Sequence, residues 1–342
     1  MVSVAQRSRT TNGARTPVTR NFSAPQPRII DVMRALIAAI ALALLAACGG
    51  GSDNATTPSP SPSSAPVAQA TNTPQQTPGP SPASNLPVHP SPVPTSTPPG
   101  PPAEDAPLYI ALGDSLSYGA GASDRYGTAF VPLVHATLSA GTGLLNLGHS
   151  GDTSGELVRH GHLDVALDEI SRRNGDSNPG NDVVLVTLEI GGNDLLDLFF
   201  DYVVPGICPT LVESLQKDEC VGILRDALDG FGPNLKQIMD RLQAADPQLN
   251  LVLMTLYNPF SGAFSALDPF GELSLEGMPD TPFPEGVNDA IRAQAQTSGV
   301  TLVEIYPLFV GKGKEYIAQD IIHPNDPGYR VMADAVVAAV AR

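Results

Sequence analysis

From Pro107 to the C-terminus, short apolar runs alternate with longer amphipathic stretches, and this alternation limits the fold more than any other feature. Parallel strands that are buried on both faces read as continuous apolar runs, and the helices between them read as amphipathic segments. The sequence therefore predicts one doubly wound α/β domain, a parallel sheet between layers of helices. The five expected strands are 108–112, 144–147, 183–189, 249–255 and 301–305.

Helices are expected between these strands and after the last one, at 128–139, 156–173, 195–203, 223–245, 285–297 and 326–340. Gly230, Gly232 and Pro233 predict a break in the longest of them. The segment 257–284 is rich in Pro, Gly and Phe and reads as a long loop. Long loops at the binding edge of such sheets are often lids or pocket walls, so Phe260, Phe264, Phe270 and Phe283 are candidates to line an acyl or aryl pocket, or simply to pack the loop.

The chain before Pro107 has a different composition. Residues 55–107 are Pro, Ser, Thr, Ala and Gln with almost no large apolar side chains, and they hold half of the chain's 34 prolines. Such a segment cannot bury a core and is expected to be a disordered, semi-extended spacer. The predicted division is an N-terminal extension with a signal peptide at 1–47, a linker at 48–106 and the folded domain at 107–342.

The segment 33–49 resembles a bacterial lipoprotein signal peptide. Met33-Arg34 precedes an apolar run, 35–44, that is short for a membrane span, and Leu45-Ala46-Ala47-Cys48 follows it. The resemblance implies cleavage before Cys48 and attachment of lipid to its thiol. An ordinary signal peptide and an uncleaved anchor are the alternatives. Met33 would also be a conventional start of translation.

The net charge argues against some binding partners, and the cysteine content leaves two redox states open. The formal net charge is −16, which argues against a basic surface for nucleic acid or anionic lipid. With Cys48 lipidated, Cys208 and Cys220 remain. They could form a disulfide in an oxidising exterior or stay as two thiols.

Several polar motifs follow predicted strands, at the edge where ligands of doubly wound sheets bind. Gly113-Asp114-Ser115 follows the first strand, a Gly-rich turn with Gly151 follows the second, and Gly191-Gly192-Asn193-Asp194 follows the third. Asp320 and His323 precede the last helix. Each motif alone could be a turn or a helix cap.

Together these residues indicate a serine hydrolase. A serine hydroxyl becomes a good nucleophile only when an imidazole takes its proton, and Asp320 could orient His323 for that purpose. The backbone amide of Gly151 and the side-chain amide of Asn193 could both point at one developing oxyanion.

These motifs, in this order, resemble the SGNH hydrolases, also called the GDSL lipase and esterase family, across essentially all of 107–342. The resemblance implies a three-layer α/β/α sandwich with a five-stranded parallel, flavodoxin-like sheet. It makes Ser115 the nucleophile, His323 the general base and acid, and Asp320 its orienting group. The oxyanion hole maps to the amides of Ser115 and Gly151 and to the side chain of Asn193. Catalysis would pass through an acyl-enzyme and need no metal or other cofactor.

Other polar residues offer weaker candidates. His149 is close enough to the site to compete with His323 as base. His160 and His162 are expected to lie on different faces of one helix, solvated and without metal. His135 is expected in mid-helix and His89 in the spacer. Asp194, Asp197 and Asp201 could suggest calcium but also fit the polar face of a helix.

The sequence thus predicts an extracytoplasmic, lipid-anchored serine esterase or lipase that acts as a monomer on an ester substrate. Members of the resembled family cleave lipids, lysophospholipids, thioesters and acetylated sugars, and some transfer acyl groups. A carbohydrate O-deacetylase or acyltransferase of the same fold therefore stays an alternative. A non-catalytic binding module tethered to the envelope is the alternative from another class.

Overall fold

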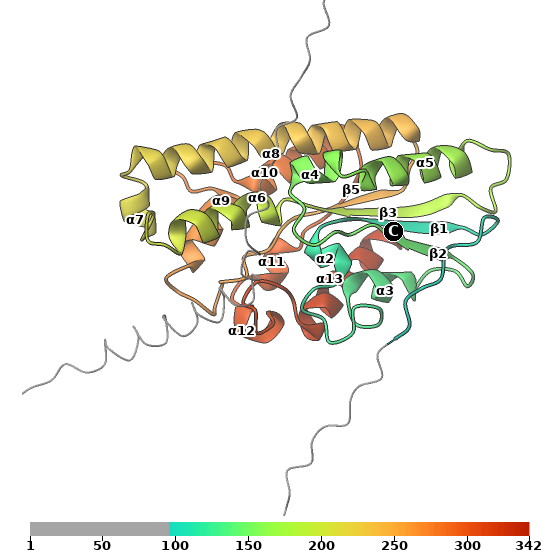
Figure 1. Ribbon diagram of the computed structural model, residues 1–342, viewed down its shortest axis with the longest axis horizontal. Helices are drawn as coiled ribbons and strands as arrows, with labels where there is room; N and C mark the ends of the chain where they lie inside the picture. Colours follow the sequence, from blue (N-terminus) through green and yellow to red (C-terminus); the bar gives the residue numbers. More distant parts are fainter. Residues whose placement is uncertain (1–95, 342) are drawn as a thin grey trace, which may run out of the picture. The chain divides into compact units, whose positions relative to one another are not determined.

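The structure is a computed structural model that describes residues 96–341, and its centre is a five-stranded sheet (Figure 1). All pairings are parallel, and the strand order is β2-β1-β3-β4-β5. The strands are β1 (Leu108–Gly113), β2 (Gly143–Asn146), β3 (Val183–Glu189), β4 (Leu251–Met254) and β5 (Thr301–Val303). The predicted α/β class, with five parallel strands, is confirmed.

Helices cover both faces of the sheet, as Figure 1 shows, and β1 explains why. All six residues of β1 are buried, and its side chains alternate between two separate apolar cores. One core includes Leu108, Ile110 and Leu112, and the other includes Tyr109 and Ala111. A strand that is apolar on both sides needs a helical layer on each side, which gives three layers.

One layer contains α4 (Ser154–Arg159), α5 (His162–Asn174), α8 (Asp218–Ala245) and α10 (Val287–Ser298), and the other contains α3 (Phe130–His135) and α13 (Asp326–Val340). The shorter elements are α2 (Ser115–Tyr118), α6 (Gly192–Leu198), the π-helical turn η1 (Phe199–Val203), α7 (Leu211–Ser214), α9 (Asp268–Glu276), α11 (Tyr306–Phe309) and α12 (Gly313–Tyr316).

The predicted break in the longest helix is wrong, because α8 runs through Pro233 without interruption. Phe231, Leu235, Ile238 and Leu242 form a buried stripe at helical spacing. Pro233 lies on the exposed side of the helix. Proline has no N–H to donate to the carbonyl oxygen of Asp229 one turn earlier, and on this exposed side water can donate to that oxygen instead, while the buried stripe holds the helix together.

The predicted helix 156–173 is two helices, α4 and α5. They meet at Gly161, whose φ of 86° is unfavourable for a residue with a side chain. The predicted helix 195–203 is likewise divided into α6 and η1, and the predicted loop 257–284 contains α9. In these segments, packing against residues that are distant in the sequence decides where the helices begin and end, and the local pattern of apolar residues does not.

Arg173 holds residues that the sequence assigns to the spacer. Its side chain is 1% exposed and donates to the carbonyl oxygens of Ala103, Ala106 and Asn181 over 2.8–3.1 Å. Its Nε also donates to Glu169 at 2.8 Å. The folded unit therefore includes chain from at least Ala103, ahead of the expected start at Pro107. The expected signal peptide, Cys48 and His89 lie outside the described residues.

Within residues 96–341, none of the helices has the length and apolar character needed to cross a bilayer.

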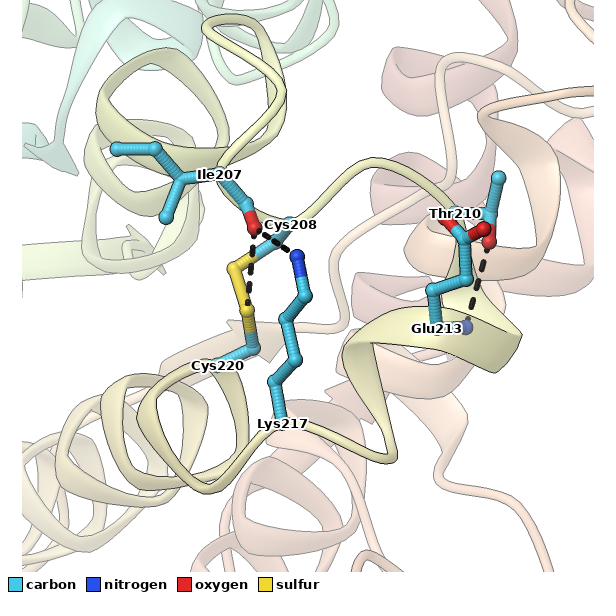
Figure 2. The surroundings of a disulfide bond; sticks show 6 residues. All are labelled: Ile207, Cys208, Thr210, Glu213, Lys217 and Cys220. Carbon is cyan, nitrogen blue, oxygen red and sulfur yellow. Dashed lines mark hydrogen bonds between the residues drawn. A yellow bond between two sulfur atoms is a disulfide. The ribbon is translucent and has the colours of Figure 1, made fainter.

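A disulfide joins Cys208 and Cys220, one of the two states that the sequence left open (Figure 2). Lys217 lies beside it and donates its ammonium to the carbonyl oxygen of Ile207 at 2.9 Å. The bond fastens the segment between η1 and α7 to the first turn of α8. A disulfide that closes a loop of this size stabilises a protein by about 3 kcal/mol in the chain-entropy model.

Candidate active site

The Gly113-Asp114-Ser115 turn projects Ser115 from the carboxyl end of β1. Gly113 has a φ of 149°, and a Cβ there would lie 2.1 Å from the carbonyl oxygen of Glu189, so only glycine fits. The carboxylate of Asp114 caps α2 by accepting the amide of Leu116 at 3.0 Å. Ser115 is the first residue of α2, and its side chain faces the site instead of the core.

Ser115, His323 and Asp320 form one chain of hydrogen bonds. His323 Nε2 lies 2.9 Å from Ser115 Oγ, and His323 Nδ1 lies 2.7 Å from Asp320 Oδ2. When Nδ1 carries the proton that Asp320 accepts, Nε2 is free to accept the serine proton. The structure thus brings together all three residues that the sequence singled out, across 208 residues between Ser115 and His323.

Asp320 is held so that it stays ionised. Its Oδ1 also accepts the backbone amides of Ile322 and His323, at 3.1 and 3.0 Å. Partial burial acts to raise the pKa of Asp320, but the hydrogen bonds and charge of His323 outweigh it and lower the pKa below its usual value. An anionic Asp320 can stabilise the imidazolium that forms when His323 takes a proton.

Asn193 lies at the start of α6, next to the turn that carries Gly151. Its Nδ2 donates to the backbone carbonyl of Asp152 at 3.0 Å and to Asp114 Oδ2 at 3.2 Å. Asn193 lines the same cavity as Ser115 and His323, whereas Gly151 lies on the exposed side of its turn. Gly151 and Asn193, two of the three expected oxyanion donors, thus belong to a turn and to the start of α6, which the hydrogen bond from Asn193 to Asp152 ties together.

A buried pair of carboxyl groups behind the serine escaped the sequence reasoning. Glu189, the last residue of β3, is 1% exposed and lies against Asp114, and neither of its carboxyl oxygens has a hydrogen-bond partner among the described residues. Burial, with the neighbouring Asp114 charge, raises the pKa of Glu189 well above its usual value. Burial also raises the pKa of Asp114 to about 6. The sequence does hold one sign of this buried pair, because Glu189 is a charged residue at the end of an otherwise largely apolar strand.

This pair makes stability depend on pH, and Glu189→Gln is expected to reduce that dependence. The folded protein keeps these protons at pH values where the unfolded chain, with carboxyl pKa values near 4, has lost them. The free energy of unfolding therefore falls as pH rises from about 4 through about 6, by up to about 1.4 kcal/mol per pH unit for each group. Urea unfolding at pH 4.5 and 7.5 should show Glu189→Gln gaining stability over the parent only at the higher pH.

The exposed Glu285 offers a matched control, because Glu285→Gln removes a carboxylate that is already solvated. Equal stability differences at both pH values for Glu189→Gln would show that Glu189 is ionised in the folded protein.

An apolar cavity opens beside Ser115 and His323, with about 1170 Å³ of empty space including its open mouth. Side chains from α6, η1, α7, α8, α9 and the segments on either side of α9 form its walls, among them Leu195, Phe199, Leu211, Leu224, Phe260, Phe270 and Phe283. Three of the four phenylalanines named from the sequence line it, but Phe264 does not. Segment 195–224 contributes a large share of the wall, including both cysteines of the disulfide, and the sequence did not predict its place in the pocket.

The histidine assignments need one correction. His149 pairs with Asp152 rather than with Ser115, so it does not compete with His323. His160 and His162 do not lie on two faces of one helix, because Gly161 separates α4 from α5 and lets both imidazoles turn toward Asp152. His135 hydrogen-bonds to the carbonyl oxygen of Thr142 at 2.7 Å.

The carboxylate of Asp194 is engaged in hydrogen bonds and gives no support for a calcium site. It accepts the amide and the hydroxyl of Ser154 at 2.8 and 2.6 Å. It fastens the start of α4 to α6.

The chain is similar to known lipases in sequence and in fold. The model of the GDSL-like lipase/acylhydrolase family matches residues 111–331, which include Ser115, Asn193, Asp320 and His323. The spore germination lipase LipC of Bacillus licheniformis is 24% identical over 237 residues, 68% of this chain and 95% of that protein. The crystal structure of the lipase Lip_vut3 from a goat rumen metagenome has a TM-score of 0.51 and 21% identity, and the match covers 68% of this chain and 97% of that one.

The family model spans well over half of the chain, and the structural match supports the same fold. The chain belongs to the GDSL-like lipase/acylhydrolase family and is a carboxylic ester hydrolase.

Proposed function

We propose that the protein is an extracytoplasmic, lipid-anchored serine esterase or lipase that cleaves esters of medium or long acyl chains through an acyl-enzyme on Ser115. The observation that carries this proposal is the hydrogen-bond chain from Ser115 through His323 to Asp320 at the mouth of an apolar cavity. A nucleophile, a base and an apolar binding space are the parts that ester cleavage of a lipid requires.

The first half of the reaction forms the acyl-enzyme. Ser115 Oγ attacks the ester carbonyl carbon while His323 Nε2 takes the serine proton, and Asp320 stabilises the resulting imidazolium. The oxyanion accepts hydrogen bonds from the amides of Ser115 and Gly151 and from Asn193. Collapse of the tetrahedral intermediate breaks the ester bond, and the alcohol leaves with the proton from His323.

The second half reverses the roles. His323 removes a proton from water, the hydroxide oxygen attacks the acyl carbon, and the proton returns to Ser115 as the acid leaves. In the resting site Asn193 donates to Asp114 and Asp152, so an oxyanion must replace one of these acceptors. The bond to Asp114 is the longer of the two, at 3.2 Å, and is the one that an oxyanion replaces at the lower cost.

The walls of the cavity support an acyl substrate over an acetylated sugar. Leucine and phenylalanine side chains dominate the lining, whereas a sugar needs polar partners for its hydroxyl groups. LipC of Bacillus licheniformis, a relative, carries the name of a spore germination lipase. A transfer reaction would use the same acyl-enzyme with another acceptor alcohol.

The proposed location rests on the N-terminal sequence and on the disulfide. Cysteines stay paired in oxidising compartments outside the cytoplasm, and the Leu-Ala-Ala-Cys48 pattern is typical of a lipoprotein cleavage site. The Pro-rich spacer could reach on the order of 150 Å in polyproline II conformation, enough to carry the domain clear of a membrane. Cys48→Ser should move the protein from the membrane fraction to the soluble fraction, and an unchanged distribution would refute the lipid anchor.

Hydrolysis of p-nitrophenyl acetate, butyrate, octanoate and palmitate tests the substrate class. We expect kcat/KM to rise from acetate to octanoate, because each buried methylene contributes about 0.8 kcal/mol. Phe270→Ala is expected to lower kcat/KM for octanoate about tenfold and to leave acetate within about twofold, since Phe270 lines the cavity.

Phe264→Ala is the matched control, because Phe264 is likewise partly exposed in the same segment but does not line the cavity. A flat or falling chain-length profile, or equal effects of the two alanine variants, would contradict the acyl pocket.

A further inference from the structure

Three imidazoles converge on one buried carboxylate near the active site. The Nδ1 atoms of His149 and His160 lie 2.7 and 3.0 Å from Asp152 Oδ1, and Nδ1 of His162 lies 3.4 Å from Asp152 Oδ2. The Asp152 side chain is 2% exposed, whereas the three histidines are 55%, 44% and 29% exposed. Solvent can therefore reach the cluster from the imidazole side only.

The backbone brings these residues together from two turns. His149 and Asp152 belong to the turn after β2, which continues into the N-cap of α4 at Thr153. His160 ends α4, and the positive φ of Gly161 redirects the chain so that His162 begins α5 on the same side. None of these side chains hydrogen-bonds to Ser115, His323 or Asp320.

The donor set suits a divalent transition metal. Ligand atoms of His149, Asp152 and His162 all lie within 4.8 Å of one another. Zinc binds imidazole nitrogen and carboxylate oxygen at about 2.0–2.2 Å in tetrahedral geometry, so its ligand atoms lie about 3.4 Å apart. Small side-chain rotations would bring the three ligands to that spacing, and the exposed side leaves the fourth position to water.

We propose that His149, Asp152 and His162 bind one divalent metal ion of the zinc class, with His160 positioning the Asp152 carboxylate. This proposal departs from the expectation from sequence that His160 and His162 are solvated and hold no metal. Two imidazoles with one carboxylate favour zinc, cobalt, nickel or copper over magnesium and calcium, which prefer ligands made of oxygen alone. Each imidazole binds the metal as a neutral ring through an unprotonated nitrogen, so a proton on the binding nitrogen moves by way of solvent to the other ring nitrogen when the metal enters.

Metal at this position would brace the turn that holds Asn193. The backbone carbonyl of Asp152 accepts Asn193 Nδ2 at 3.0 Å, and Gly151 directly precedes Asp152. A bound ion would thereby limit the motion of Gly151 and Asn193, two of the three expected oxyanion donors. This consequence for activity rests on the proposed function, whereas the metal site itself does not.

Calorimetric titration of the untagged, chelator-treated full chain with Zn²⁺ tests the site. We expect one ion per chain, with millimolar Mg²⁺ and Ca²⁺ unable to compete. Cobalt in place of zinc should give the intense visible absorption of a four-coordinate ion. His149→Gln and His162→Gln are expected to weaken binding more than 100-fold, and His160→Gln about 10- to 100-fold, as for residues that orient a ligand.

His135→Gln serves as the control, because His135 hydrogen-bonds to Thr142 and lies outside the cluster. It should bind zinc like the parent. Absence of saturable binding would overturn the proposal and reduce the cluster to hydrogen bonding, and unchanged binding by His162→Gln would place the ion elsewhere. Because calorimetry and cobalt absorption do not use turnover, a failure of the metal site is distinguishable from a failure of the proposed hydrolysis.

Discussion

Ser115→Ala is expected to lower kcat for p-nitrophenyl octanoate by about 10⁶-fold, the size of effect seen when a triad serine is removed. The alanine variant keeps the cavity and the oxyanion donors but has no oxygen for His323 Nε2 to activate at 2.9 Å. Asp114, the adjacent residue, is engaged with the amide of Leu116. Binding of substrate should persist while turnover is lost.

Ser117→Ala is the matched control for this variant. Ser117 belongs to the same short helix, α2, but its hydroxyl donates to the carbonyl oxygen of Leu112 at 3.1 Å, toward the core. Its loss should reduce stability by about 1 kcal/mol and leave kcat near the parent value. A fluorophosphonate probe should label the parent and Ser117→Ala but not Ser115→Ala. If Ser115→Ala kept activity within tenfold of the parent, the acyl-enzyme mechanism would be wrong.

Asp320→Asn is expected to lower kcat by about 10⁴-fold without unfolding the site. An asparagine oxygen can still accept the amides of Ile322 and His323, so the loop should keep its shape. The asparagine NH₂ group, however, would donate to His323 Nδ1. The imidazole proton would then sit on Nε2, where it faces Ser115 and blocks proton transfer.

The exposed Asp334 in α13 provides the corresponding control, and Asp334→Asn should leave kcat unchanged. Rates of fluorophosphonate labelling should fall with kcat in Asp320→Asn, while the melting temperature stays within a few degrees of the parent. A fall in labelling that only tracks the loss of folded protein would mean that Asp320 acts through stability alone.

Much of the fold and the grouping of the triad could be predicted, because both depend on short-range rules. β1 is apolar on both faces, which requires a parallel sheet covered by helices. The carboxyl ends of such strands lie at one edge, so Ser115 and Asn193 had to be neighbours. Asp320 and His323 lie three residues apart in one loop, so the sequence also predicts that their side chains meet.

The sequence reasoning failed where one residue redirected the backbone or where distant segments packed together. Gly161 turns His162 back toward Asp152, and a helix assumed to be continuous placed these histidines apart. Pro233 sits in α8 because a buried stripe outweighs its local cost. The cavity is lined by 195–224 together with residues of α9, a helix that the pattern of 257–284 did not predict.

The Cys208–Cys220 bond makes the covalent support of one cavity wall depend on the redox state of the compartment in which the chain folds. Thiols stay reduced in the cytosol, so a copy that folded there would assemble its triad while this wall of the cavity lacked its covalent fastening. The same chain after oxidation would hold the wall in place. Reductant in a purification buffer is therefore expected to act on the cavity wall and not directly on the triad, which contains no cysteine.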